Sequence, residues 1–374
     1  MKVVIAGGGT GGHIYPGISI AREFLKRDPN TSILFVGTER GIERDIIPKE
    51  GFNLKSISVG GLKGRFSLRT VISLLILPIG TVQSLLILKG YKPDIVIGVG
   101  GYVAGPLILA SWLLGISSVI QEQNLFPGIT NRILGRFVDK IAISFQGSEI
   151  YFPKKKISLT GNPVRSEFYN LDSDPIRSFT SNETDKDIEK KRGDRFTLLV
   201  FGGSQGSHKI NLAMVDTLDI FSDIKDEIHI IHQTGEEDFP FVKGEYSKRD
   251  ISADIRPFIF NMADNYRKAD LVVCRAGATT IAELTACGRC AILIPFPYAA
   301  NNHQEINARY MEEKGAAMVI KDSYLTGELL AEGVISLMRD RKRLKEMEVE
   351  SKRLGNPDAG SKIVEMCYKL TYDL

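Results

Sequence analysis

The stretch that decides the fold is 271–304, LVVCRAGATTIAELTACGRCAILIPFPYAANNHQ. It begins with a short apolar run typical of a buried strand, breaks at RAGA, and continues as a helix from about Thr279. The first turn of a helix has backbone N–H groups without intrahelical partners and carries the positive end of the helix dipole. The stretch therefore predicts a strand, a tight turn and a helix start that can hold a phosphate group.

Glu283 lies one turn into this predicted helix. Its carboxylate is placed to accept hydrogen bonds from the two hydroxyls of a ribose. A second interpretation stays open, because Thr280-x-x-Glu283 also fits a capping box in which the glutamate serves only its own helix.

A glycine-rich turn also follows the first apolar run of the chain, in GGGTGGH at 7–13, and Pro16 is expected in the first turn of the next helix. Gly7, Gly9 and Gly12 fit the spacing of a dinucleotide site. The acidic residue required about 20 residues later is missing, so an NAD-linked dehydrogenase is disfavoured and another phosphate or sugar ligand is favoured. His13, at the mouth of this turn and just before the predicted helix, is either a neutral general base or a side chain that only hydrogen-bonds the turn.

The same strand, glycine turn and helix start recur at 196–207, FTLLVFGGSQGS. Two such units in 374 residues predict an α/β protein of two Rossmann-like, doubly wound domains facing across a cleft. We expect an N-terminal domain at 1–165, a polar linker at 166–195 and a C-terminal domain at 196–345. A helix within 346–374 is expected to pack back on the first domain.

Charge is unevenly distributed along the chain. The net charge of +3 combines +10 in residues 1–165 with −7 in the remainder. A basic first half favours an anionic membrane surface or a phosphorylated substrate as partner. Nucleic acid is disfavoured, because no nucleic-acid-binding motif is present.

No charged residue occurs at 70–88, between Arg69 and Lys89. The length would suit a membrane span, but the strand predicted at 92–99 belongs to the same sheet as the strand that begins at Lys2. A span would place two strands of one parallel sheet on opposite sides of a membrane. Pro78 and Gly80 also interrupt the segment. We therefore expect crossover helices with an apolar face that rests on an anionic membrane, and an ordinary buried crossover is the alternative. The basic residues expected to meet the membrane with this face are Lys63, Arg65, Arg69, Lys89 and Lys92.

Two further observations concern possible polar sites. Glu122 and Asn124 follow a predicted strand at 118–121, where ligands bind in parallel sheets, although Asn124 could serve only the turn. The four cysteines are too few for a disulfide scaffold and favour a reducing cytoplasm, and no residue pattern predicts a metal site.

Eight short motifs occur in an order that resembles the MurG family of bacterial N-acetylglucosaminyltransferases: GGGTGGHIYPG at 7–17, GVGGY at 98–102, QEQN at 121–124, GNPVR at 161–165, GGSQGS at 202–207, HQTG at 232–235, CRAGATTIAEL at 274–284 and NNHQ at 301–304. The resemblance implies the GT-B architecture and an inverting transfer without cofactor or metal. N-acetylglucosamine would pass from UDP-N-acetylglucosamine to the C4 hydroxyl of N-acetylmuramic acid in undecaprenyl-pyrophosphoryl-MurNAc-pentapeptide, which converts lipid I to lipid II in peptidoglycan biosynthesis, a pathway tied to cell shape and division. It also implies a peripheral protein on the cytoplasmic face of the inner membrane, with other cell-wall synthesis proteins as further partners.

The resemblance assigns residue roles as well. His13 is similar to the family's proposed base, and Glu283 to its ribose ligand. The remaining expected contacts are Thr10, Gly11, Gly12 and Asn124 near donor or acceptor groups; Arg165 near the donor; Ser204 at the diphosphate at a helix start; Ile259 reading uracil through its backbone; Ala278, Thr279, Thr280, Ile281 and Ala282 as the phosphate turn and helix start; and Gln304 at the donor sugar. Two stretches, ATTIAE and NNHQ, differ from the family's usual motifs. The second difference lies directly before Gln304 and makes it a weaker assignment than Glu283. A related enzyme acting on UDP-N-acetylglucosamine without a lipid acceptor, such as an epimerase, is the alternative.

Overall fold

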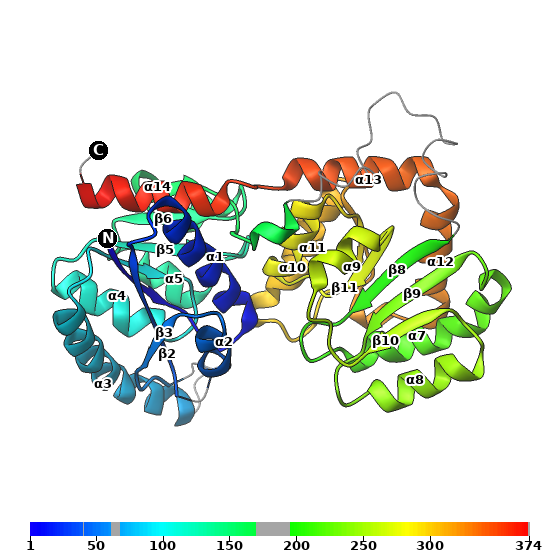
Figure 1. Ribbon diagram of the computed structural model, residues 1–374, viewed down its shortest axis with the longest axis horizontal. Helices are drawn as coiled ribbons and strands as arrows, with labels where there is room; N and C mark the ends of the chain where they lie inside the picture. The colour runs from blue at the N-terminus through cyan, green and yellow to red at the C-terminus, as the bar shows by residue number, and fades with distance from the viewer. Residues whose placement is uncertain (40, 61–67, 170–194, 373–374) are drawn as a thin grey trace. The chain divides into compact units, whose positions relative to one another are not determined.

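A computed structural model describes residues 1–39, 41–60, 68–169 and 195–372 (Figure 1). The chain divides into two compact units, Met1–Arg165 with Asn356–Leu374, and Ser166–Gly355. Most of the predicted linker lies outside the described residues. The division falls later than the boundary predicted after residue 345, because Glu348 forms a buried ion pair with Arg289 at 3.1 Å inside the second unit.

The first unit contains a parallel sheet with the strand order β3-β2-β1-β4-β5-β6-β7. Val3 pairs with both Ile33 and Ile95, which places β1 between β2 and β4. The central strands β1, β2 and β4 are near-continuous apolar runs because both faces of the sheet are covered there. Their bounds are β1 Lys2–Ala6, β2 Ser32–Gly37, β3 Asn53–Ser56, β4 Ile95–Gly98, β5 Ser118–Glu122, β6 Lys140–Ile143 and β7 Ile157–Leu159.

Helices cover the two faces of this sheet over separate cores. One core joins Val3 and Ile5 to α1 and α14, and the other joins Val4 and Ala6 to α3 and α4. The C-terminal helix α14, red in Figure 1, therefore packs beside α1 in the first unit. The helices are α1 Gly11–Arg27, α2 Glu43–Lys49, α3 Leu68–Tyr91, α4 Ala104–Leu113, α5 Ile129–Leu134 and α14 Ala359–Tyr372.

The second unit repeats this plan with the strand order β10-β9-β8-β11-β12-β13, again all parallel. Its strands are β8 Phe196–Phe201, β9 Ile228–Gln233, β10 Ala253–Arg256, β11 Leu271–Cys274, β12 Ala291–Leu293 and β13 Ala317–Val319. Its helices are α7 His208–Phe221, α8 Phe239–Lys248, α9 Met262–Lys268, α10 Ala278–Cys287, α11 His303–Glu313, α12 Gly327–Arg339 and α13 Arg341–Leu354. The prediction of two Rossmann-like, doubly wound domains is confirmed.

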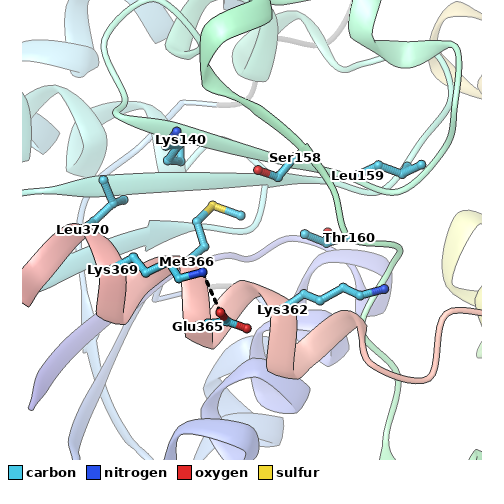
Figure 2. Close-up of a pocket in the computed structure, with 9 residues that line it drawn as sticks. All are labelled: Lys140, Ser158, Leu159, Thr160, Lys362, Glu365, Met366, Lys369 and Leu370. Atoms are coloured by element: carbon cyan, nitrogen blue, oxygen red, sulfur yellow. Dashed lines mark ion pairs between the residues drawn. The ribbon is translucent and has the colours of Figure 1, made fainter. Parts of the chain in front are cut away.

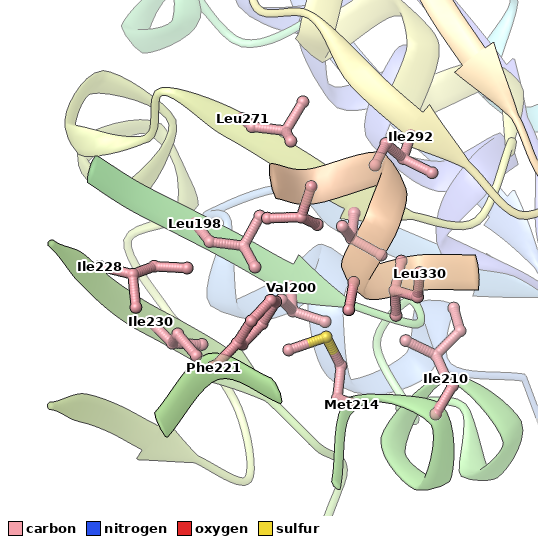
Figure 3. Close-up of a cluster of buried hydrophobic side chains, with 14 of the residues drawn as sticks. Leu198, Val200, Ile210, Met214, Phe221, Ile228, Ile230, Leu271, Ile292 and Leu330 are labelled. Atoms are coloured by element: carbon pink, nitrogen blue, oxygen red, sulfur yellow. The ribbon is translucent and has the colours of Figure 1, made fainter. Parts of the chain in front are cut away.

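Alternation along the strands builds the core of the second unit. Figure 3 shows Leu198 and Val200 of β8 pointing to one face, where Met214 and Phe221 of α7 and Leu330 of α12 meet them. All five side chains are completely buried. This core fixes the sheet whose carboxyl edge carries the predicted nucleotide-binding residues.

The apolar segment predicted as interrupted crossover helices is one helix, α3, which continues through Pro78. Gly80 has a packing role there, since a Cβ at this position would lie 2.5 Å from the carbonyl oxygen of Ser58. Among the described residues, no helix is long and apolar enough to cross a membrane.

Where α14 meets the β6–β7 edge of the first sheet it leaves a shallow groove of about 430 Å³ (Figure 2). Its charged lining consists of Lys140, Lys362, Lys369 and Glu365, and Lys369 pairs with Glu365 at 2.7 Å. None of the residues predicted to bind substrate lines this groove.

Candidate active site

The first group of predicted residues lies in the loop after β1 and in the first turn of α1. Gly9 has φ +86°, a left-handed conformation that favours glycine. Thr10 is the N-cap of α1, and its carbonyl oxygen accepts from the N–H groups of His13 (3.1 Å) and Ile14 (3.3 Å). His13 is therefore the third residue of the helix and not the residue before it.

The predicted place of Pro16 changes for the same reason. The helix begins at Gly11, so Pro16 lies inside it, after the first turn. Glycine is a poor helix former, but the bonds to Thr10 close the first turn here. The sequence pattern identified the helix but placed its first residue too late.

The imidazole of His13 lies against the turn after β4. A Cβ on Gly100 would lie 2.6 Å from His13 Nδ1, and the φ of Gly100 is +100°. The next residue, Gly101, approaches the carbonyl oxygen of Gly8 equally closely, at 2.5 Å from its would-be Cβ. Since β1 and β4 flank the point where the strand order reverses, this is the place where doubly wound sheets bind ligands.

Asn124 and Arg165 lie on the same unit. The side chain of Gln123 donates to the carbonyl oxygen of Val99 at 2.6 Å, which ties the loop carrying Asn124 to the end of β4. The guanidinium of Arg165 lies 5.3 Å from the ring centre of Tyr15, one turn along α1 from the glycine loop. The structure thus brings Arg165 to the helix that carries Thr10, Gly11, Gly12 and His13.

Glu122 is buried, and its carboxylate holds the turn that follows β5. Its two oxygens accept from the Asn124 and Gly128 N–H groups and from the side chains of Asn124 and Asn131, at 2.9–3.2 Å. Burial raises the pKa of Glu122, and these hydrogen bonds offset part of that rise. The turn chemistry is therefore supplied by Glu122, while the side chain of Asn124 is half-buried.

In the second unit, Ser204 and Ile259 belong to loops that one glutamine connects. Gln233, the last residue of β9, donates through Nε2 to the carbonyl oxygen of Gly203 at 2.7 Å and accepts through Oε1 from the Ile259 N–H at 2.8 Å. Ser204 is exposed and lies in the loop that leads to Ser207, the N-cap of α7. The Ile259 N–H is engaged by Gln233, so its carbonyl oxygen is the group left to read a base.

The helix start predicted within the stretch 271–304 is that of α10, with Gly277 as its N-cap and Ala278 as its first residue. Thr279 and Thr280 are half-buried, Ile281 is buried and Ala282 is half-buried. Because Gly277 and not Thr280 caps the helix, the capping-box interpretation of Glu283 is wrong. Glu283 is half-buried and accepts from the hydroxyl of the fully buried Tyr266 at 3.4 Å.

Arg275 joins three loops around this helix start. Its side chain is largely buried and donates to Ser207 Oγ (2.7 Å), to the carbonyl oxygens of Ile294 and Pro295 (3.2 Å each) and to Asp322. Sequence reasoning missed both Arg275 and Gln233, although each lies inside a motif that carried the family resemblance. The only local signal was a polar residue at the end of a buried strand.

Gln304 is the second residue of α11, and its Oε1 accepts from the Phe296 N–H at 3.0 Å. The backbone before it is in the left-handed region at Asn301 (φ 52°) and Asn302 (φ 57°), which Asn tolerates better than most residues. Because Oε1 of Gln304 accepts from the Phe296 N–H, the amide nitrogen of Gln304 is oriented away from Phe296. No cluster of three or more His, Cys, Asp or Glu side chains suited to a metal ion occurs in the described parts of the chain.

Comparison with known families agrees with this arrangement. The N-terminal domain of glycosyltransferase family 28 matches residues 3–143, and the C-terminal domain of the same family matches residues 197–363. The fold and both matches define a glycosyltransferase built from two Rossmann-like domains.

Individual proteins give a narrower assignment. A Myxococcus xanthus (strain DK1622) protein named UDP-N-acetylglucosamine–N-acetylmuramyl-(pentapeptide) pyrophosphoryl-undecaprenol N-acetylglucosamine transferase is 46% identical over 99% of this chain and 93% of its own length. A Syntrophus aciditrophicus (strain SB) protein of the same name is 47% identical, covering 98% of each chain. The crystal structure of Acinetobacter baumannii MurG superposes with a TM-score of 0.77 at 27% identity, over 98% of this chain and 99% of that one. The chain therefore belongs to the MurG family, within glycosyltransferase family 28.

Proposed function

We propose that this protein transfers N-acetylglucosamine from UDP-N-acetylglucosamine to the C4 hydroxyl of N-acetylmuramic acid in undecaprenyl-pyrophosphoryl-MurNAc-pentapeptide. The names of its relatives support the donor and the lipid-linked acceptor. The structural observation that carries the proposal is the half-buried carboxylate of Glu283, which the buried Tyr266 hydroxyl orients beside the glycine-capped start of α10. A carboxylate in this position suits the two hydroxyls of a ribose whose diphosphate meets the helix N-terminus.

The second unit is proposed to bind the donor. The diphosphate would lie at the first turn of α10, formed by Ala278, Thr279, Thr280, Ile281 and Ala282, with Ser204 contributing from the β8–α7 loop. The uracil would meet the carbonyl oxygen of Ile259, because Gln233 holds the N–H. Gln304 would donate its amide nitrogen to the sugar, since its Oε1 is held by Phe296.

The first unit is proposed to bind the acceptor. Its expected contacts are Thr10, Gly11, Gly12 and Asn124 near donor or acceptor groups, with Arg165 near the donor. His13 accepts the proton of the C4 hydroxyl as the oxygen attacks the anomeric carbon from the face opposite UDP. The bond between the anomeric carbon and the diphosphate oxygen breaks, and UDP leaves with the bonding electrons. The dipole of α10 stabilises the negative charge that develops on the leaving diphosphate.

Exposed apolar side chains on three packed helices support a membrane surface as a further partner. Large apolar residues that are 38–67% exposed occur on α3, α4 and α5, and α4 packs against both other helices. They are Leu77, Ile79, Val82, Leu86, Trp112, Leu113, Ile129 and Ile133. Ile79, Val82 and Leu86 share one face of α3, and Lys89 is exposed at its end. Lys63 and Arg65, also predicted to meet the membrane, lie outside the described residues.

This surface suits peripheral binding to the anionic cytoplasmic face of the inner membrane, where other cell-wall synthesis proteins would also be met. The double variant Val82→Glu and Leu86→Glu should lose at least tenfold in binding to vesicles that contain phosphatidylglycerol, in a flotation assay. Phe241→Glu is the matched control, since Phe241 is 45% exposed on α8 of the second unit. Equal flotation of the double variant and the control would contradict the membrane assignment.

The transfer itself is tested with purified protein, UDP-N-acetylglucosamine and a lipid I analogue. UDP release and formation of the disaccharide-bearing lipid are expected only when both substrates are present. An epimerase would convert the donor without any acceptor. Folded protein that releases no UDP with both substrates would refute the proposed function.

A further inference from the structure

Glu43, the first residue of α2, places a carboxylate inside the first unit beside the glycine loop. Its side chain is completely buried, with an exposed fraction of 0%. Oε1 accepts from the N–H of Thr38 at 2.8 Å and from its hydroxyl at 2.7 Å, and Oε2 accepts from the N–H of Gly9 at 3.0 Å. One side chain therefore joins the loop after β2 to the loop after β1.

Three glycines surround this carboxylate so closely that no larger residue fits without a shift. A Cβ on Gly8 would lie 2.5 Å from Glu43 Oε1, and a Cβ on Gly37 would lie 2.6 Å from Glu43 Cγ. The clearance at Gly41 is smaller still. Three glycines that each accommodate the same side chain indicate a built position and not a surface contact.

The hydrogen bond from the Gly9 N–H to Glu43 connects Glu43 with the segment that carries His13, the proposed base. Gly9 is left-handed, and its neighbour Thr10 caps α1 and accepts the His13 N–H. On the other side, the carbonyl oxygen of Gly8 lies against Gly101 while the His13 ring lies against Gly100. The Gly9 peptide is thus fixed by Glu43, two residues before a helix turn whose third residue is His13.

We propose that Glu43 is a positioning residue, which holds the Gly9–Thr10 segment so that His13 and the first turn of α1 meet the acceptor. This inference rests on the proposed function. It assigns Glu43 no contact with substrate and no proton transfer.

The charge of Glu43 is essential to this role. Burial raises the pKa of the carboxyl, but the hydrogen bonds from Gly9 and Thr38 outweigh it, so the pKa lies below its ordinary value. The group is ionised at neutral pH and accepts all three bonds. A glutamine has one oxygen and one NH₂ group, so it must present a donor either to Gly9 or to Thr38.

Glu43→Gln is therefore the variant that tests the proposal, and Glu50→Gln is its matched control. Glu50 follows the same helix but is partly exposed and pairs with Arg22. In the transfer assay, E43Q should lower kcat/KM for the lipid I analogue at least tenfold, while the Kd for UDP stays within twofold. E50Q should match the wild type in both. Thr38→Val removes the hydroxyl bond alone and should give a smaller loss than E43Q.

Hydrogen exchange separates this proposal from the proposed function and from simple loss of stability. The peptide covering 7–14 should exchange at least tenfold faster in E43Q than in the wild type, at a temperature where circular dichroism shows both folded. Unchanged exchange, or an E43Q enzyme with wild-type kcat/KM, would overturn the positioning role. If the wild type lacks transferase activity but E43Q still loosens 7–14, the proposed function fails and the positioning role stands. If E43Q does not fold, T38V with unchanged exchange at 7–14 would overturn the role.

Discussion

Removal of the Glu283 carboxylate tests the donor half of the proposed site. Two hydrogen bonds from ribose hydroxyls to a carboxylate are each worth about 1.5 kcal/mol at the lower end of the range for charged groups. Glu283→Ala should therefore weaken UDP binding by about 3 kcal/mol, or roughly 150-fold in Kd. Isothermal titration with UDP measures this directly.

Glu283→Ala also removes a hydrogen bond within the protein. The hydroxyl of the buried Tyr266 donates to Glu283, so alanine leaves that hydroxyl without this acceptor, at a cost of about 1–3 kcal/mol in the free energy of unfolding. Glu283→Gln keeps an oxygen for Tyr266 but removes the charge, and should give an intermediate Kd. Tyr266→Phe keeps the carboxylate and loses only a long bond of 3.4 Å, so Kd should rise about two- to fivefold.

Thermal unfolding of each variant must show folded protein at the titration temperature. A folded E283A protein that binds UDP within threefold of the wild type would refute the ribose assignment. A Y266F protein as weak as E283A would instead show that the packing of α9 on α10, and not the carboxylate, controls binding.

Two further predictions concern histidines. His13→Ala should lower kcat by at least about 100-fold, the usual minimum for loss of a general base, with the Kd for UDP unchanged; equal losses in both would contradict its assignment to the acceptor side. His232 is completely buried, and burial lowers its pKa from 6.5 to about 3, so the unfolded chain binds a proton that the folded chain does not, and stability falls as the pH drops below 6.5. Between pH 6.5 and pH 4.5 this group removes about 2.3 kcal/mol, so the free energy of unfolding in urea should depend less steeply on pH in His232→Gln, whatever its value at pH 7.5; an unchanged slope would contradict the pKa shift.

Local patterns in the sequence were sufficient to predict the layers of this protein. The runs at 2–6, 196–201 and 271–274 are apolar apart from Lys2 and Thr197, which is typical of parallel strands covered on both faces. The glycine-rich turns after β1 and β8 could also be predicted, since each directly follows an apolar run. The start of α10 was predicted within one residue, because glycine and alanine interrupt the apolar run there.

The errors come from contacts that local patterns do not encode. Pro78 suggested an interrupted segment, but packing of Gly80 against Ser58 accompanies a continuous α3. The capping box at Thr280 failed because Gly277, three residues earlier, is already the N-cap. Ile259 was predicted to read uracil through its backbone, and no local pattern indicated that the distant Gln233 occupies the N–H of that backbone. Each outcome depends on a partner that no helical or strand period can reveal.

The residues missed by sequence reasoning share one physical role. Glu43 begins a helix, Gln233 ends a strand and Arg275 follows a strand, and each side chain satisfies backbone or hydroxyl groups of a neighbouring loop. A loop held in this way keeps its conformation before the substrate arrives, so less conformational entropy is lost on binding. Substitution of a residue that touches substrate removes one contact, whereas loss of one of these three should loosen a whole loop. Substitution of any of these three residues should therefore give two effects together: faster hydrogen exchange over an entire loop and weaker binding of the substrate that this loop meets. Substitution of a residue that contacts the nucleotide or the acceptor should weaken binding without loosening the loop.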